Sequence, residues 1–285
     1  MTITVTGATG QLGRLVIADL LERGIPASEI VAAVRNPAKA GDLAALRVQI
    51  READYTKPET LVTAFAGTHK LLLISSSEVG QRVDQHRNVV EAAVKAGVGQ
   101  ILYTSVLNAD TSRIALAAEH KATEDLIRES GVPFVFLRNG WYLENYTANL
   151  APALENGVIL GSTGQGRVGA AARADLAAAA AAVLASDGHD HQVYELAADL
   201  PFTIAELAAE VARQSGKPVS YLDLPAAEYA KALAGFGVPQ QLAEIYADSD
   251  LGIGRGELSS ESGDLSRLIG RPTISLVNGV AVALR

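Results

Sequence analysis

The chain has 285 residues, of which 48% are hydrophobic, and it carries a net charge of −8. This length allows a sizeable core, built as one large domain or as a domain with an appended lobe. The acidic balance, without a basic run, argues against nucleic-acid binding, and the lack of cysteine excludes disulfides, thiolate nucleophiles and cysteine-ligated zinc. No export leader is evident, so we expect a cytoplasmic protein, and the most apolar window, 169–186, contains charges and predicts a packed helix.

A glycine-rich turn follows the first apolar stretch of the chain. Residues 3–5 are typical of a strand, and leucines and valine recur at helical spacing over 12–21. Between them lies Thr6-Gly7-Ala8-Thr9-Gly10-Gln11-Leu12-Gly13. Gly7 allows a tight turn, Gly10 lets the backbone approach a pyrophosphate, and Gly13 lets the helix lie close to the strand. The helix N-terminus attracts anions, so the position of this turn predicts a dinucleotide site, with a purely structural turn as the alternative.

Strand-like and helix-like stretches alternate through the first half of the chain. We expect strands at 30–34, 48–50, 70–74, 100–104 and 134–137, and helices over 37–46, 58–65, 82–96 and 114–129. Repeated βα units predict an α/β fold with a doubly wound parallel sheet of the Rossmann type and right-handed crossovers.

The pattern loosens after Arg138. Helices are predicted over 142–154, from about 175, and over 203–214, 222–234 and 239–246, with short strands at 158–160 and 193–196 and a loop at 248–263. Thr203 and Glu206 have the spacing of a capping box. We therefore expect an NADP-binding core at 1–138 and a smaller α/β substrate-binding lobe at 139–285, with segments that return to the core.

Arg35 stands where the second predicted strand ends, about where such folds place the residue that reads the ribose. A carboxylate there would accept from a 2′-hydroxyl, but this chain has Arg35-Asn36-Pro37, with Lys39 beyond. The guanidinium matches phosphate geometry, so we predict a preference for NADPH over NADH. The alternative is an ordinary surface arginine that opens a helix.

Polar residues follow the next two strands. Asp54 could accept from an adenine amino group or could hold a turn, and its position favours neither role. Ser75, Ser76 and Ser77 come after the fourth strand, where small hydroxyls suit a backbone lying against phosphate and ribose. The alternative is that they are polar strand-end residues.

No tyrosine is followed by lysine four residues later, although reductases of this general fold that act on alcohols use that pair. In its place stands His120, which periodicity puts on an inward face with Thr123 and Ile127, whereas Lys121 shares an outward face with Glu124, Asp125 and Arg128. His120 is our one candidate catalytic residue, as a hydrogen-bond donor or proton relay, with a packed core histidine as the alternative. His86 is predicted to be structural, and no cluster has metal-ligand spacing.

The sixth strand ends in Leu137-Arg138-Asn139-Gly140-Trp141-Tyr142-Leu143-Glu144-Asn145, which holds the only tryptophan. Glycine beside amides and aromatic rings suits the stacking of a nicotinamide and a flat apolar pocket. The alternative is that these aromatic side chains only fill the space between the two lobes.

These motifs together resemble the NmrA-like family of atypical short-chain dehydrogenase/reductases, most closely its bacterial quinone-reductase branch. The similarity rests on the glycine turn, the Val34–Lys39 and Leu73–Glu78 segments, the Asn139–Asn145 run and Leu265–Pro272, and it extends nearly from end to end. The resemblance implies NADPH bound by the turn, Arg35, Ser76 to Glu78 and Asn139 to Glu144.

The same resemblance implies a small-molecule quinone as hydride acceptor and no flavin. A quinone is already electrophilic, and its reduced anion can be protonated by water, so a dedicated acid is less needed than positioning. A non-catalytic NADP(H)-binding regulator is the main alternative, and a sugar-nucleotide epimerase is less favoured because that chemistry needs the tyrosine base. We expect neither nucleic acid nor membrane as a partner, and a homodimer is the assembly that we consider.

Overall fold

The computed structural model describes residues 1–285, which divide into two compact units. The first unit comprises Met1–Val106, Glu119–Asn139 and Arg173–Tyr194. The second comprises Leu107–Ala118, Gly140–Ala172 and Glu195–Arg285. The chain therefore passes between the units several times, and segments distant in sequence complete each of them.

The first unit is built on a parallel sheet. Seven strands follow the order β3-β2-β1-β4-β5-β6-β8, and the pairs from β3 through β6 are all parallel. The strands are β1 (Ile3–Val5), β2 (Ile30–Val34), β3 (Gln49–Glu52), β4 (Lys70–Leu73), β5 (Gln100–Val106), β6 (Phe134–Asn139) and β8 (Gln192–Leu196). The order reverses between β1 and β4, which confirms the predicted doubly wound fold.

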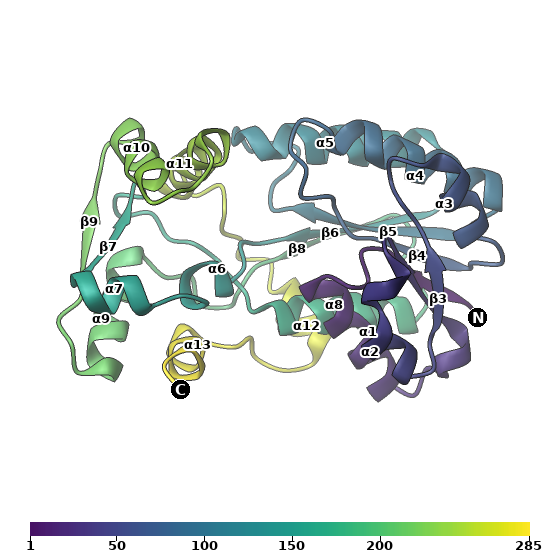
Figure 1. Ribbon diagram of the computed structural model, residues 1–285, viewed down its shortest axis with the longest axis horizontal. Helices are drawn as coiled ribbons and strands as arrows, with labels where there is room; N and C mark the ends of the chain where they lie inside the picture. The colour runs from purple at the N-terminus through teal and green to yellow at the C-terminus, as the bar shows by residue number, and fades with distance from the viewer. The chain divides into compact units, whose positions relative to one another are not determined.

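Helices cover both faces of this sheet (Figure 1). On one face α1 (Gln11–Glu22) packs against α8 (Arg173–Ala185), and on the other α3 (Pro58–Ala64) packs against α4 (Arg82–Ala96), beside α5 (Ala115–Glu129). The alanine-rich α8 is buried on nearly every side, as its composition predicts, and no helix of the protein is long and apolar enough to cross a membrane. Helix α4 covers the predicted range, and Gly97 in the left-handed conformation ends it.

Apolar strand residues pack under α3, α4 and α5. Leu71 and Leu73 of β4, with Phe136 of β6, are fully buried in this core together with helix residues. Parallel strands covered on both faces are apolar on both sides, which is why their sequences are continuous hydrophobic runs. The core thereby fixes the strand ends, from which the polar turns extend.

The second unit contains a small parallel sheet of β7 (Val158–Gly161) and β9 (Ser220–Asp223). Helix α9 (Ile204–Ser215) contacts both strands, and its capping box of Thr203 and Glu206 is formed as predicted. Helix α10 (Ala226–Gly235) packs on α11 (Gln240–Gly254), while α13 (Leu276–Ala283) contacts α6 (Glu144–Thr147) and α9. The remaining helices are α7 (Ala151–Asn156) and α12 (Asp264–Ile269).

Two predicted helices are each divided in the structure. The predicted 37–46 helix is a 3₁₀ turn, Pro37–Lys39, followed by α2 (Gly41–Ala45), because Ala40 N donates to Pro37 O three residues back and not to a residue four back. The predicted 142–154 helix starts only at α6, because Leu143 N donates to Ala171 O, and it is divided from α7 because Pro152 has no N–H to donate to Ala148 O. A tertiary hydrogen bond and a proline thus override helical periodicity in this segment.

Two further predictions in the second unit are wrong. Residues 222–223 belong to β9 and not to a helix, since Leu222 pairs with Leu160. The predicted loop from 248 is helical up to Gly254, and its acidic side chains are engaged: Asp248 accepts from Ala115 N at 2.6 Å and Asp250 accepts from Ser162 N at 2.7 Å. Polar residues whose partners are remote in sequence have the composition of a loop, although they belong to a helix here.

Candidate functional site

The glycine-rich turn joins β1 to α1 with a tightly packed backbone. Gly7 adopts φ +56°, and Gly10 N donates to Gly7 O at 2.8 Å. A Cβ on Gly13 would lie 2.7 Å from both Ala8 Cα and Gly7 O, which leaves no room for any other residue. Gly13 therefore lets the helix start against the turn itself, which keeps the backbone amides of that turn in one compact cradle.

The N-terminus of α1 presents its amides without a protein cap. Gly10, the N-cap, has no side chain to accept from them, and the first turn of α1 contains no acidic residue. The positive end of the helix dipole is thus uncompensated by the protein at this point. Arg14, which sequence reasoning missed, donates from Nε to Thr9 O at 3.0 Å and forms an ion pair with Asp42. This arrangement suits a diphosphate.

Arg35 lies one residue past β2 and is largely exposed, with 72% of its side chain accessible. Its Nη1 donates to Glu78 Oε1 at 3.0 Å, so the structure brings together two residues that were predicted separately. Lys39 is exposed in the 3₁₀ turn, and its carbonyl oxygen accepts from Arg14 Nη2 at 3.4 Å. Arg14 therefore reaches the backbone of the 3₁₀ turn that follows β2 and Arg35.

The serine segment after β4 is held by buried side chains. Ser75 N donates to Thr104 Oγ1 at 2.8 Å, and Ser76 N donates to His86 Nε2 at 3.0 Å. Because His86 Nε2 accepts, its Nδ1 carries the proton and faces Thr123 Oγ1 at 3.0 Å. Burial, aided by the nearby charge of Arg82, lowers the pKa of His86 to about 3, which keeps the acceptor nitrogen free. His86 is structural, as predicted.

A buried ion pair anchors the remainder of this segment. Arg82 Nε donates to Ser76 O at 2.8 Å, and Arg82 Nη1 contacts Glu119 Oε2 at 2.7 Å. Glu119 Oε1 in turn accepts from Gly80 N at 2.7 Å. Ser77 is exposed and is not part of these contacts. The loop is thus fixed at both ends while its tip stays accessible.

Asp54 acts within its own turn. Its Oδ1 accepts from Thr56 N at 3.0 Å and from Thr56 Oγ1 at 2.8 Å, and Lys57 lies 3.8 Å from Oδ2. Of the two roles left open by the sequence, the turn is the one that these contacts support.

His120 points inward, as its periodicity predicted. Its side chain is only 7% exposed, and its Nδ1 lies 2.7 Å from Tyr103 Oη. Burial, together with the positive charge of Arg82 and the neighbouring His86, holds the pKa of His120 well below its usual range. The ring is therefore neutral at physiological pH, and Lys121 on the outward face pairs with Asp125 at 2.5 Å.

The prediction that Glu124 lies on an outward helix face is wrong. Glu124 is fully buried, and its carboxylate accepts from Ser105 Oγ at 2.7 Å and from Arg138 Nη2 at 2.8 Å. Arg128 Nη2 also lies 3.2 Å from Glu124 Oε2, and the Arg128 side chain approaches this carboxylate from the surface. Sequence periodicity missed this ion pair because Arg138 comes from β6.

Asn139 ends β6 in the first unit, and its Oδ1 is buried without a hydrogen-bond partner. An unpaired buried oxygen is costly, and a bound group that donates to it would remove that cost. The carboxamide of a nicotinamide ring is such a group. The glycine cradle and this oxygen therefore fit a nicotinamide dinucleotide.

The rest of the predicted aromatic segment, residues 140–144, belongs to the second unit. Gly140 N donates to Leu196 O at 2.8 Å, and a Cβ there would lie 2.8 Å from Gly169 O. Trp141 accepts through its carbonyl oxygen from Ala171 N at 2.9 Å, while its side chain is half-buried. Tyr142 forms a bridge with Ala171, Leu143 is buried, and Glu144 begins α6.

A polar cluster in the second unit has no counterpart in the sequence predictions. Burial raises the pKa of Asp250 to about 6, although a hydrogen bond from Ser162 N opposes this effect. Tyr146 Oη is buried without a hydrogen-bond partner, and Asp250, Tyr229 and Tyr221 act on it electrostatically. Tyrosines in a helix pattern look like core residues, so only tertiary structure could reveal this cluster.

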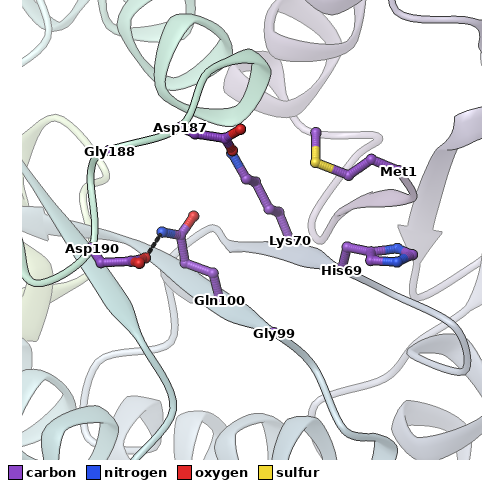
Figure 2. Close-up of a pocket in the computed structure, with 8 residues that line it drawn as sticks. All are labelled: Met1, His69, Lys70, Gly99, Gln100, Asp187, Gly188 and Asp190. Carbon is purple, nitrogen blue, oxygen red and sulfur yellow. Dashed lines mark hydrogen bonds and ion pairs between the residues drawn. The ribbon is translucent and has the colours of Figure 1, made fainter.

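A cavity of about 300 Å³ lies at the opposite, amino end of the sheet in the first unit (Figure 2). Lys70 reaches Ser186 O and, at 3.2 Å, Asp187 Oδ1, while Gln100 Nε2 donates to Asp190 Oδ1 at 2.5 Å. The one lysine of this lining is already engaged, and Asp187 and Asp190 add two carboxylates, so the cavity does not fit a polyanionic dinucleotide.

Known proteins are similar to this chain along almost its whole length. A family profile described as NAD(P)H-binding matches residues 7–187. Quinone oxidoreductase 2 of Escherichia coli (strain K12) is 53% identical over 279 residues, which cover 98% of this chain and 97% of that protein.

Two solved structures have the same architecture. The NADPH-dependent quinone oxidoreductase QOR2 of Escherichia coli, complexed with NADPH, gives a TM-score of 0.97 at 52% identity, with 100% of both chains covered. The triphenylmethane reductase of Citrobacter sp., complexed with NADP(H), gives 0.95 at 43% identity, with 99% of this chain and 100% of that chain covered.

Proposed function

Because the chain belongs to the NAD(P)H-binding, NmrA-like family, we propose that it is an NADPH-dependent quinone oxidoreductase. The observation that carries the proposal is the 53% identity, over 98% of the chain, to a quinone oxidoreductase. When bound, NADPH supplies a hydride. The acceptor is a quinone or a similarly electrophilic aromatic compound, and no flavin takes part.

The first unit supplies the cofactor-binding residues. We assign the pyrophosphate to the uncapped amides at the start of α1, where Gly13 keeps the turn compact. Arg35, with Lys39 and Arg14 nearby, is assigned to the 2′-phosphate, for which a guanidinium offers two parallel donors. Asn139 Oδ1 is assigned to the nicotinamide carboxamide, which would give this buried oxygen its missing donor.

We assign His120 no proton transfer, because its contacts are those of a packed core histidine. Its neutral ring is bound to Tyr103 Oη at 2.7 Å inside the core, and burial together with the positive charge of Arg82 opposes its protonation. A quinone that accepts a hydride leaves an anion delocalised over its ring, and water can protonate that anion. The contribution of the chain is therefore to orient two bound molecules, which can account for most of such an acceleration.

The acceptor is assigned to the second unit, which contains most of the substrate-binding lobe predicted at 139–285. The support is chemical: the segment 140–144 combines an indole and a phenol ring with a glycine, and flat apolar surfaces suit a quinone ring. A cytoplasmic location, a homodimer and the absence of nucleic-acid partners stay predictions.

The direct test is consumption of reduced nicotinamide by the purified, flavin-free protein with a simple benzoquinone, with NADPH and NADH measured in parallel. We expect rapid quinone-dependent oxidation that is faster with NADPH. A Gly13→Val variant purified in the same way serves as the control for contaminating reductases, and it should be inactive. Tight binding of NADPH without turnover on quinones or dyes would instead favour a non-catalytic NADP(H) sensor.

A further inference from the structure

We propose that Glu78 determines cofactor specificity by competing with the 2′-phosphate of NADPH for Arg35 and by accepting from the 2′-hydroxyl of NADH. The inference rests on the proposed function, because it takes Arg35 to be the residue that reads the 2′-position. It adds Glu78 as a second residue that distinguishes the two cofactors. Glu78 has the opposite charge to Arg35 and follows a different strand of the sheet.

The ion pair of Arg35 and Glu78 spans the carboxyl end of β1. Arg35 follows β2 and Glu78 comes after β4, and in the sheet β1 lies between these two strands. The contact between Arg35 Nη1 and Glu78 Oε1 is 3.0 Å. The glycine-rich turn starts at the end of that same central strand, so this ion pair forms beside the place assigned to the dinucleotide.

Glu78 is held in place independently of Arg35. Its Oε2 accepts from Gln85 Nε2 at 2.7 Å, and Gln85 is a buried residue of α4. Its backbone N donates to Ser76 Oγ at 3.2 Å, which makes a tight turn of the segment. When a phosphate takes the guanidinium, Glu78 therefore stays near the 2′-position because Gln85 retains it.

The two cofactors meet this carboxylate in opposite ways. The 2′-phosphate of NADPH carries the same sign of charge as Glu78, and it gains Arg35 only by displacing Oε1. The 2′-hydroxyl of NADH can donate to Oε1 and leave the ion pair intact. Folds of this class usually place such a carboxylate at the end of the second strand, where this chain has Arg35-Asn36-Pro37.

Replacing Glu78 by glutamine tests the proposal, because it removes the charge and keeps the size. We expect Glu78→Gln to tighten NADPH binding by about threefold to fivefold, the scale of an exposed ion pair, and to weaken NADH binding by a similar factor. Dissociation constants are measured from the fluorescence of the reduced nicotinamide. Opposite shifts are the expected signature, since a residue that only shapes the loop would change both constants in the same direction.

Asp125→Asn is the matched control. Asp125 is 41% exposed, against 42% for Glu78, and it also pairs with a surface cation, Lys121. Its loss changes the net charge of the chain by the same amount. A general electrostatic effect on the more anionic NADPH would therefore appear in both variants, and the proposal requires it in Glu78→Gln alone.

Arg35→Ala, measured alongside, separates this inference from the proposed function. If Arg35→Ala weakens NADPH and NADH equally, the assignment of the 2′-phosphate is wrong. If Arg35→Ala acts on NADPH alone while Glu78→Gln changes neither constant, or changes both in one direction, the role of Glu78 is overturned and that of Arg35 stands. Thermal unfolding without cofactor checks that each variant is folded.

Discussion

The two ends of the parallel sheet in the first unit both gather polar groups, yet only one suits a dinucleotide. At the carboxyl end, the amides of the glycine turn and of α1 are uncapped, and Arg35 is exposed. At the amino end there is a distinct cavity of about 300 Å³, but Lys70 already binds Ser186 O and Asp187. The comparison teaches that a hollow alone is a poor guide to an anionic site, and that backbone amides without a protein partner are the feature expected to favour an anionic cofactor.

The largest effect is expected from a change in the glycine turn. If such a change left NADPH binding intact, the proposed difference between the two ends of the sheet would be wrong. Gly13→Ala places a Cβ 2.7 Å from the backbone of residues 7 and 8, so the turn must shift. Since a hydrogen bond from a backbone amide to a charged phosphate contributes up to about 3 kcal/mol, we expect NADPH affinity to fall by about a hundredfold. Gly41→Ala, where a Cβ meets nothing within 4 Å, is the control and should bind normally. Normal binding by Gly13→Ala would contradict the account.

Arg35→Ala tests whether the carboxyl end of the sheet distinguishes NADPH from NADH at the 2′-position. Loss of a charge-assisted contact should weaken NADPH binding by about tenfold to a hundredfold and leave NADH binding nearly unchanged. Isothermal titration with both cofactors measures the effect. Arg167→Ala removes a cation from a surface ion pair with Glu206 in the second unit, and it should change neither affinity. Equal losses for both cofactors in Arg35→Ala would reject the assignment.

The carboxyl end should also be the more acid-sensitive one. The pKa of His86 is lowered to about 3 by burial, below its ordinary value of 6.5. The unfolded chain therefore takes up a proton that the folded chain does not, and stability is lost as pH falls below 6.5. Between pH 7 and pH 5 this loss is about 2 kcal/mol. Denaturant unfolding of His86→Asn should lack that part of the pH dependence, and an unchanged profile would count against the neutral His86.

The smallest effect is expected at the amino end. Gln100 is only 8% exposed, its Nε2 contacts Asp190, and its Oε1 is buried without a partner. Gln100→Ala should leave the affinities for NADPH and NADH unchanged in the same titrations. A clear loss of NADPH binding would mean that the cavity of Figure 2 takes part in cofactor recognition.

Local patterns in the sequence predicted most of the first unit. The strand, glycine turn and helix over 3–22, the end of α4 at Gly97 and the inward face of His120 each depend on neighbours in the chain. The capping box at Thr203 is equally local. Such features are encoded within a few residues, so their spacing is enough to find them.

The features that sequence reasoning missed are contacts between distant segments. Glu78 meets Arg35 across 43 residues, and Glu124 is buried because Arg138 reaches it from another element. The sequence predicts a loop at Asp250 because Ser162, whose backbone N donates to the Asp250 carboxylate, is remote in sequence. Charged residues are usually solvated, so only the tertiary structure shows which of them are paired inside.

Hydrogen–deuterium exchange with and without NADPH tests most directly which end of the sheet binds the cofactor. The account predicts slower exchange, on adding NADPH, in peptides covering residues 6–14 and 75–81 at the carboxyl end. Peptides covering residues 186–190, beside the cavity at the amino end, should exchange at unchanged rates. Protection confined to residues 186–190, with none at the glycine turn, would contradict the account.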